Sequence, residues 1–167
     1  IFRYCRLYGP RRTYVKIRAI RHKKRRFAAL PPSSRQLQPG QAVGLIGCGN
    51  YGFSNIAYYL HRQFGRVIGG CMDVDVHRAA SLSQYYGAPL YTSDAAELLD
   101  LYAIRMIYVA SNHASHAEYA IQALQKGKDV YIEKPHVVSE DQLRRLMEAM
   151  DRSEGHVYLG FNRPGSR

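Results

Sequence analysis

The sequence has few cysteines, no long apolar run and, over its first 40 residues, no acidic side chain. Its three cysteines are Cys5, Cys48 and Cys71, and no two of them form a CxxC pair. This odd and scattered set argues against a disulfide framework and against a cysteine zinc site. We therefore expect the cysteines to be small buried hydrophobic side chains in a protein of the reducing cytoplasm.

No apolar segment approaches the roughly 20 residues that cross a bilayer, so the sequence predicts no membrane span. The pair Arg11-Arg12 begins no twin-arginine export signal, because the basic segment TYVKIRAIRHKKRR follows where an apolar stretch would stand. An arginine-rich, acid-free start is also found in organelle transit peptides, but its later half shows no helical amphipathicity. The expected location is the cytoplasm.

Charge divides the chain into two parts. The 167 residues include 24 Lys+Arg and 13 Asp+Glu, which gives a formal net charge of +11. Residues 1–40 hold 12 of the basic residues and no acid, and residues 41–167 hold the other 12 with all 13 acids. The segment LPPSSRQLQPG (30–40) between them is typical of a linker. We predict a basic arm with its linker over 1–40 and one domain over 41–167.

The basic arm admits two interpretations. Residues 13–20, TYVKIRAI, alternate apolar and basic side chains, which predicts a half-exposed strand. The run RHKKRR (21–26) suits nucleic acid or another polyanion, and Tyr4, Tyr8 and Tyr14 could stack on bases. The alternative is a solvated arm or a part of an adjoining domain, and we favour that simpler interpretation.

After the linker, apolar runs typical of strands alternate with helical patterns. The predicted strands are 42–47, 66–73, 89–92, 105–111, 129–134 and 156–161, and the predicted helices are 51–64, 76–87, 93–99, 114–127 and 139–155. Short connections between alternating strands and helices indicate a parallel sheet with helices on both faces. The predicted fold class is therefore α/β, a doubly wound Rossmann sheet of six parallel strands.

A glycine motif follows the first predicted strand. The stretch GLIGCGNYG contains Gly47-x-Gly49-x-x-Gly52 and opens the first predicted helix. In such a motif the first glycine makes the tight turn, the second lets a pyrophosphate approach the backbone, and the third lets the helix pack on the strand. The phosphates would lie on the helix N-terminus, beside Asn50 and Tyr51. A flexible glycine turn is the alternative, but the strand before and the helix after favour a dinucleotide.

Asp73 ends the second predicted strand, 21 residues after Gly52. A ribose acceptor belongs at this place in a dinucleotide fold. A carboxylate accepts hydrogen bonds from a 2′-hydroxyl and repels a 2′-phosphate, so the sequence favours NAD over NADP as the cofactor. Arg78 leaves NADP open, because its guanidinium can turn toward a phosphate.

The segment after the fourth predicted strand (110–120) lies near the point where a doubly wound sheet reverses direction and binds ligands. The polar side chains that could face a ligand there are Ser111, Asn112, His113 and His116. An ordinary Ser/Asn helix cap is one alternative. A metal site is another, but Glu118 points off the face of His113 and His116, so we predict no metal.

The stretch YIEKPH (131–136) ends the fifth predicted strand at the same carboxyl edge as the glycine loop. Lys134 would lie there beside the nicotinamide, with Glu133 next to it in the cofactor site. A lysine in that position can hold a substrate oxygen and stabilise developing negative charge. The alternative is an ion pair at the strand end.

The order of these motifs resembles the Gfo/Idh/MocA family of nicotinamide oxidoreductases. The glycine motif and the strand-ending Asp are followed by ASNHASHAEYAIQALQKGKDVYIEKP and by GFNRP. The resemblance covers about 41–167 and implies a bound NAD(P) and a sugar, cyclitol or related polyol substrate. It also implies that Lys134 is the catalytic-site lysine, with a cis Lys134–Pro135 bond. Ser111-Asn112 departs from the Thr-Pro that is common in the family.

The resemblance further implies a second α/β domain after the strand that HVYLGF matches. That domain would supply the substrate wall and the Asp and His that complete proton transfer. Because the sequence runs only from Ile1 to Arg167, we expect one domain of a longer dehydrogenase, inactive by itself and homo-oligomeric at full length. The alternative function is a non-catalytic nucleotide-binding module whose basic arm binds nucleic acid or another polyanion.

Overall fold

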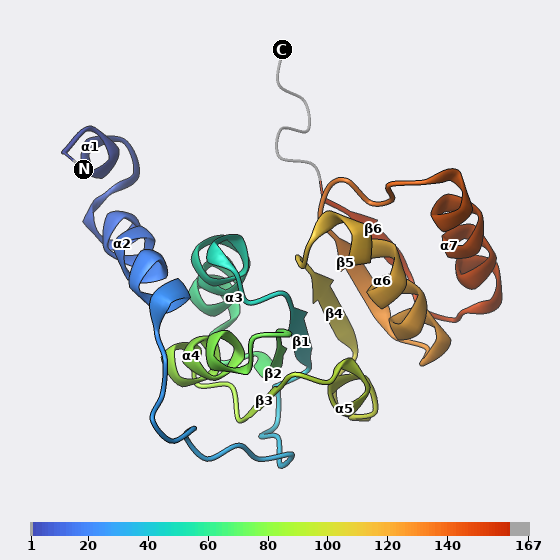
Figure 1. The fold of residues 1–167 in the computed structure, drawn as a ribbon, viewed down its shortest axis with the longest axis horizontal. Coiled ribbons are helices and arrows are strands. Elements are labelled where there is room, and N and C mark those ends of the chain that lie inside the picture. Colours follow the sequence, from blue (N-terminus) through green and yellow to red (C-terminus); the bar gives the residue numbers. More distant parts are fainter. Residues whose placement is uncertain (1, 161–167) are drawn as a thin grey trace.

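The computed structural model describes residues 2–160, and its central element is a parallel sheet of six strands (Figure 1). The strands are β1 (Val43–Ile46), β2 (Ile68–Met72), β3 (Leu90–Thr92), β4 (Met106–Val109), β5 (Asp129–Ile132) and β6 (Val157–Leu159). They lie in the order β3-β2-β1-β4-β5-β6, and every neighbouring pair is parallel. The chain reverses direction across the sheet between β1 and β4, which confirms the doubly wound α/β fold.

Helices cover both faces of this sheet. They are α1 (Phe2–Tyr8), α2 (Pro10–Lys24), the π-helical turn η1 (Gly52–Ile56), α3 (Ala57–Phe64), α4 (Val76–Tyr86), α5 (Ala95–Leu99), the 3-10 turn η2 (His113–Ser115), α6 (His116–Gln125) and α7 (Glu140–Arg152). Residues of α2, α3 and α4 share one core cluster with Leu45, whereas residues of α5, α6 and α7 share another with Ile46. Because successive strand residues point to opposite faces, the two clusters lie on opposite sides of the sheet.

Capping residues set several helix ends close to the predicted ones. Ser139 begins α7, since its Oγ accepts a hydrogen bond from Gln142 N at 3.2 Å. Gly87 ends α4 in the left-handed conformation, with φ 73° and ψ 30°. The cap of α5 is Asp94, whose Oδ1 accepts from Ala96 N at 2.9 Å, so this helix starts two residues after the predicted boundary at 93.

Residues 13–20 belong to helix α2, so the predicted strand in the basic arm is wrong. The buried residues of α2 are Arg12, Thr13, Val15, Ala19 and His22. This spacing is that of a helix face, but three of the five side chains are polar or charged. Apolar periodicity therefore shows only part of the buried face. Val15 and Ala19 join the core cluster of α3 and α4, so α2 is packed on the domain and is not a solvated arm.

The linker forms no helix or strand over residues 30–40. It runs along β3, one of the two outer strands of the sheet. Ser33 Oγ donates to Tyr91 O and accepts from Tyr91 N, both at 3.1 Å, and Ser34 N donates to Pro89 O at 3.0 Å. The linker thus occupies hydrogen-bonding groups at a sheet edge that would otherwise be exposed. The division of the chain at residue 40 stays a prediction.

Other expectations concern the cysteines, the membrane and the last residues. Cys48 and Cys71 are buried, as expected, while Cys5 is only partly buried. Within the part of the chain that the structure describes, no helix has the length and apolar character to cross a bilayer. The sixth strand ends at Leu159, and the last four residues of the GFNRP motif, 161–164, lie outside the described residues.

Candidate cofactor cleft

A cleft of about 320 Å³ opens at the carboxyl edge of the sheet, where the loops after β1, β2 and β4 meet. Of the predicted site residues, it is lined by Gly47, Gly49, Asp73, Ser111 and Asn112. The cleft lies at the reversal of strand order, where open α/β sheets bind their ligands. Apolar walls that the sequence analysis did not single out come from Ile46, Met72, Val74, Ala110 and Tyr119.

The three glycines of the motif are required for different reasons. Gly47 has φ +96°, and a Cβ added to it would lie 2.4 Å from the Ala110 carbonyl carbon. A Cβ on Gly52 would lie 2.2 Å from Gly47 O. The chain's own packing therefore requires glycine at both positions. A Cβ on Gly49 would meet nothing within 4 Å, so the space over Gly49 is open to a ligand.

The helix that follows this loop begins at Asn50. Its first hydrogen bond runs from Phe53 N to Gly49 O at 3.0 Å, and Ser54 Oγ donates to Asn50 O at 2.7 Å. The amides of the first turn have no partner inside a helix, and they carry the positive end of its dipole. The loop therefore offers N–H groups and partial positive charge to an anion, as predicted for a phosphate.

Asp73 is held between the glycine loop and the turn after β2. Its side chain is buried, Cys48 N donates to Oδ2 at 2.8 Å, and Asp75 N donates to Oδ1 at 2.9 Å. A carboxylate has about four acceptor sites, so these two bonds leave capacity for ligand hydroxyls. Asp73 is thus fixed at the edge of the cleft in the position predicted for a ribose acceptor.

The arginines near Asp73 are engaged by a different carboxylate. Arg78 Nε lies 3.2 Å from Asp75 Oδ2, and Arg26 Nη2 lies 3.0 Å from the same oxygen. Asp75 also caps α4, because its Oδ1 accepts from His77 N at 3.2 Å. Arg78 lines the cleft, but its guanidinium shares an ion pair there.

The loop after β4 contains both a helix cap and cleft residues. Asn112 Oδ1 accepts from Ser115 N at 3.1 Å and caps η2, so the alternative of an ordinary cap is also realised. His113 is exposed, whereas His116 is buried and does not line the cleft. The ring of His116 lies between two carbonyls, with Nδ1 2.8 Å from Pro135 O and Nε2 3.1 Å from Ser111 O. It joins the loops that follow β4 and β5.

Glu118 lies in an ion pair and away from the two histidines. Arg145 Nη1 donates to its Oε2 at 2.9 Å, and Gln142 Nε2 donates to its Oε1 at 3.2 Å. The hydrogen bond from Arg145 lowers the pKa of the Glu118 carboxyl. Within residues 2–160, no group of three or more His, Cys, Asp or Glu side chains is placed to hold a metal ion.

Tyr51 and Glu133 line a separate cavity of about 580 Å³, on the face of the sheet that carries α3. Glu133 is buried and accepts a hydrogen bond from Tyr131 Oη at 3.0 Å. Burial, together with a hydrogen bond to Glu133, raises the pKa of Tyr51 to about 12. These two predicted site residues are therefore not among those that line the cofactor cleft.

Lys134 is the second residue after β5 and is exposed at the carboxyl edge of the sheet. The Lys134–Pro135 peptide bond is cis, as the resemblance implied. None of the ion pairs among residues 2–160 includes Lys134, and Glu133 bonds a tyrosine. The alternative of a Glu133–Lys134 ion pair at the strand end is therefore not realised.

The sequence analysis missed the contact between α2 and the glycine loop. His22 Nε2 donates to Cys48 O at 2.7 Å, and its ring stacks on Phe53 with the centroids 4.3 Å apart. Cys48 in turn donates its N–H to Asp73. A residue of the arm thus supports the loop that forms the cleft. No local pattern around His22 signals this contact, because it joins residues 26 positions apart.

Two further basic side chains of α2 bind the π-helical turn. Lys16 Nζ donates to Ser54 Oγ at 3.0 Å and to Asn55 Oδ1 at 3.1 Å. Arg12 donates to Ser54 O and to Asn55 Oδ1. Burial lowers the pKa of Lys16. Part of the positive charge of the arm therefore positions the helix after the glycine loop and does not face solvent.

The strand order, the glycine loop and the anchored Asp73 define a Rossmann domain of the dinucleotide-binding class. Residues 42–161 match the Gfo/Idh/MocA family, described as an oxidoreductase family with an NAD-binding Rossmann fold, and the chain belongs to this family. The predicted family is confirmed. The chain therefore contains an NAD(P)-binding domain of the oxidoreductase type.

Curated relatives are oxidoreductases and inositol dehydrogenases. Oxidoreductase P35 of Formosa agariphila is 28% identical over 120 residues, which cover 72% of this chain and 37% of that protein. Inositol 2-dehydrogenase 3 of Saccharopolyspora erythraea is 32% identical over 122 residues, covering 72% of this chain and 36% of that protein. The chain thus spans little more than a third of the length of these relatives.

Solved structures show the same fold. KijD10, a 3-ketoreductase from Actinomadura kijaniata in complex with TDP-benzene and NADP, has a TM-score of 0.65 at 24% identity, covering 71% of this chain and 37% of that one. The WlbA dehydrogenase from Chromobactrium violaceum, in complex with NADH and UDP-GlcNAcA, has a TM-score of 0.66 at 18% identity, covering 80% and 38%. One neighbour contains NADP and the other NADH.

Proposed function

We propose that the cleft binds NAD(H) and that the chain is the cofactor-binding part of a dehydrogenase acting on a sugar, cyclitol or related polyol. Gly47, Gly49 and Gly52 form the pyrophosphate loop, with the amides of Asn50 and Tyr51 at the helix start. Asp73 accepts hydrogen bonds from the ribose, and Ser111 and Asn112 form the opposite wall. His116 holds that wall to the loop carrying Glu133 and Lys134. When bound, the nicotinamide supplies the hydride chemistry.

The open space over Gly49 carries this proposal. Packing inside the protein explains the glycines at 47 and 52, but no atom of residues 2–160 explains the one at 49. A bound pyrophosphate that approaches the backbone does explain it. In this proposal the helix N-terminus binds the phosphate charge, and the carboxylate of Asp73 accepts from the ribose hydroxyls.

The electrostatics of the cleft favour NAD over NADP. Asp73 presents a carboxylate that accepts from a 2′-hydroxyl and repels a 2′-phosphate. Arg78 and Arg26 are both within ion-pair distance of Asp75, so their charge is partly balanced before a ligand arrives. A 2′-phosphate would have to compete with Asp75 for these arginines and would meet Asp73 as well.

The exposed Lys134 is the proposed catalytic residue. It stands at the carboxyl edge of the sheet without an ion-pair partner among residues 2–160. Its ammonium can donate to the oxygen of a carbinol or carbonyl group and stabilise negative charge that develops there. The inositol dehydrogenases among the relatives support a polyol as the substrate class.

Calorimetry with NAD⁺ on the wild type, Gly49→Ala and Gly49→Val tests the cofactor site. Because a Cβ at Gly49 meets nothing within 4 Å, both variants should fold with an unchanged melting temperature. We expect Gly49→Val to weaken binding by at least about tenfold, with Gly49→Ala in between. Equal affinities in well-folded variants would refute the proposed site.

A second measurement concerns turnover. We expect the 167-residue chain to bind the cofactor and to give no steady reduction of NAD⁺ with polyols, sugars or sugar acids, measured by absorbance of the reduced cofactor. The chain spans about 37% of the length of its relatives, which supports the expectation that turnover also needs residues of the kind found in the rest of those longer proteins. Steady turnover that Lys134→Ala abolishes would show that these residues are a complete enzyme.

A further inference from the structure

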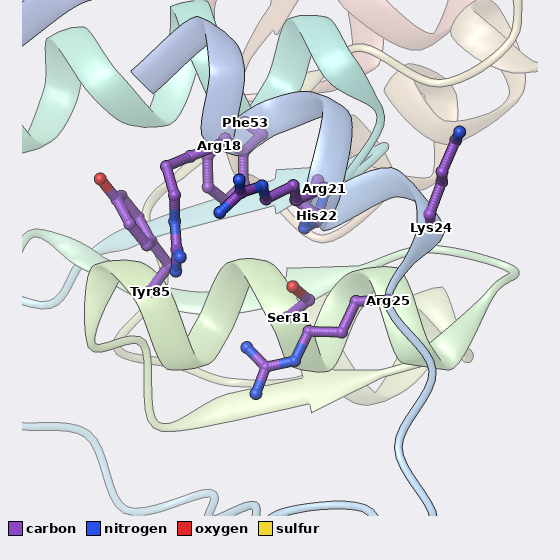
Figure 2. Close-up of a pocket in the computed structure, with 8 residues that line it drawn as sticks. All are labelled: Arg18, Arg21, His22, Lys24, Arg25, Phe53, Ser81 and Tyr85. Carbon is purple, nitrogen blue, oxygen red and sulfur yellow. The ribbon is translucent and has the colours of Figure 1, made fainter. Parts of the chain in front are cut away.

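A third cavity, of about 530 Å³, lies between α2 and α4 (Figure 2). It shares no lining residue with the cofactor cleft. Its cationic residues all come from the second half of α2 and the residue after it: Arg18, Arg21, Lys24 and Arg25. Ser81 and Tyr85 of α4 line the facing side, and no acidic residue is part of the lining.

The cations recur along one helix. Arg18, Arg21 and Lys24 are three residues apart, so they span about 9 Å of the helix axis, and Arg25 follows at the end of α2. Like charges at such spacings destabilise a helix. None of the ion pairs among residues 2–160 includes any of the four. No carboxylate of residues 2–160 therefore lies within ion-pair distance of these four side chains.

Aromatic contacts position two of these side chains. The Arg18 guanidinium carbon lies 5.5 Å from the centre of the Tyr85 ring, and that of Arg25 lies 4.3 Å from the Phe27 ring. Such contacts involve the flat face of the guanidinium and leave its N–H groups at the rim. The arginines can therefore donate hydrogen bonds to a ligand without losing these contacts.

A buried acceptor is also present in the lining. His22 is 4% exposed, and its Nδ1 has no hydrogen-bond partner among the residues that the structure describes. Because Nε2 faces the carbonyl of Cys48, Nε2 carries the proton and Nδ1 of the neutral ring is an acceptor. Buried polar atoms in proteins are nearly always partnered, so this unpartnered atom, on a side chain that lines the cavity, points to a ligand group. A protonated phosphate oxygen is a group that can donate to it.

We propose that this α2–α4 cavity binds a small molecule that carries two or more phosphate groups. Guanidinium forks match the oxygens of phosphates, and a row of cations about 9 Å long accommodates more than one phosphate. The volume lies within the range of small-molecule sites, roughly 300 to 1,000 Å³. The contacts of His22 and Phe53 place this ligand next to the glycine loop but outside the cofactor cleft.

Titration calorimetry with inorganic tripolyphosphate, in the presence of saturating NAD⁺, tests the proposal on the 167-residue chain. The cavity variant is Arg18→Gln/Arg21→Gln/Arg25→Gln. The matched control is Arg3→Gln/Arg6→Gln/Lys23→Gln, which removes the same charge from exposed residues outside the cavity. We expect the cavity variant to lose at least about 100-fold in affinity, because each charge-assisted contact contributes up to about tenfold. The control should stay within about twofold of the wild type, since it loses only general charge attraction for the anion, which salt screens and which the cavity variant loses equally.

Melting temperatures verify that the variants fold, and Arg25→Gln alone, at an exposed position, gives a second and milder test. It should lose about tenfold in affinity with an unchanged melting temperature. Equal losses in the cavity variant and the control would mean general charge attraction and overturn the proposal. Loss of tripolyphosphate binding in Gly49→Val without NAD⁺ would also overturn the proposal, since the anion would then bind at the glycine loop. A single-stranded oligonucleotide that binds the cavity more tightly than tripolyphosphate would overturn it as well. If NAD⁺ does not bind, calorimetry without NAD⁺ still compares the tripolyphosphate affinity of the cavity variant with that of the control, and so tests the proposal separately from the cofactor site.

Discussion

Replacing His22 tests whether the basic arm stabilises the cofactor domain and supports its glycine loop. His22 Nε2 donates to Cys48 O at 2.7 Å, and the ring stacks on Phe53 at 4.3 Å. His22→Phe keeps a ring on Phe53 and removes the donor from a buried carbonyl, which should cost about 1 to 3 kcal/mol. His22→Ala also removes the ring contact and leaves a void, for a total of about 3 to 5 kcal/mol.

The same substitution should weaken the cofactor site. The carbonyl of Cys48 accepts from His22 and its N–H donates to Asp73, so the residue that holds Asp73 loses one of its hydrogen bonds. We expect His22→Phe to reduce NAD⁺ affinity by about threefold to tenfold, which corresponds to at most about 1.4 kcal/mol. Urea denaturation measures the first effect and calorimetry the second.

Ile20→Ala is the matched control, because Ile20 is 60% exposed on the same helix. It should change stability by about 0.5 kcal/mol or less and leave NAD⁺ affinity unchanged. If His22→Phe is as stable as the wild type and binds NAD⁺ equally well, the arm does not support the glycine loop.

The pH dependence of this contact has a definite sign. Burial lowers the pKa of His22 below its ordinary value of 6.5, so the unfolded chain takes up a proton first as the pH falls. The stability that neutral His22 contributes is therefore present above 6.5 and is lost as the pH falls through the lowered pKa. The difference in unfolding free energy between the wild type and His22→Phe should shrink from pH 7.5 to pH 5, measured in urea at each pH.

Other substitutions test the cleft and one ion pair. Gly47→Ala should destabilise the fold by at least about 2 kcal/mol in urea denaturation, because its Cβ would meet the backbone of Ala110 at 2.4 Å with φ +96°. Asp73→Ser should weaken NAD⁺ and shift the preference toward NADP⁺ in direct titrations; a wild type that already prefers NADP⁺ would contradict the assignment of Asp73. Glu118→Gln should cost about 1 kcal/mol or less at pH 7. Because Arg145 lowers the pKa of Glu118, the stability that this ion pair contributes is present above pH 4.5, the ordinary pKa, and is lost as the pH falls through the lowered pKa. The unfolding free energy of Glu118→Gln should therefore fall less steeply with decreasing pH than that of the wild type.

Local patterns along the chain were enough for the fold class and for the centre of the cleft. Gly52 is required by a backbone contact within the loop, and Gly47 by its positive φ together with the backbone of Ala110, and a position of this kind accepts only glycine. Asp73 could be placed because it directly follows β2, and the carboxyl ends of parallel strands meet at one edge. The alternation of apolar runs and helical patterns likewise predicted the six strands. Burial on both faces explains the apolar runs of β1, β2 and β3, whereas β6 leaves Tyr158 and Leu159 exposed.

Only the tertiary structure decided the role of the basic arm and the grouping of the other site residues. The buried face of α2 includes Arg12, Thr13 and His22, whose partners lie in η1 and in the glycine loop. The periodicity of apolar residues does not reveal a helix face that buries polar side chains, because side chains such as Arg12 and His22 form hydrogen bonds with residues far away in the sequence. The packing of the sheet likewise separated Tyr51 from the cleft and joined His116 to Pro135. These contacts depend on which loops meet in space, whereas the positive φ of Gly47 and the contact of Gly52 with Gly47 O lie within a few residues of the chain.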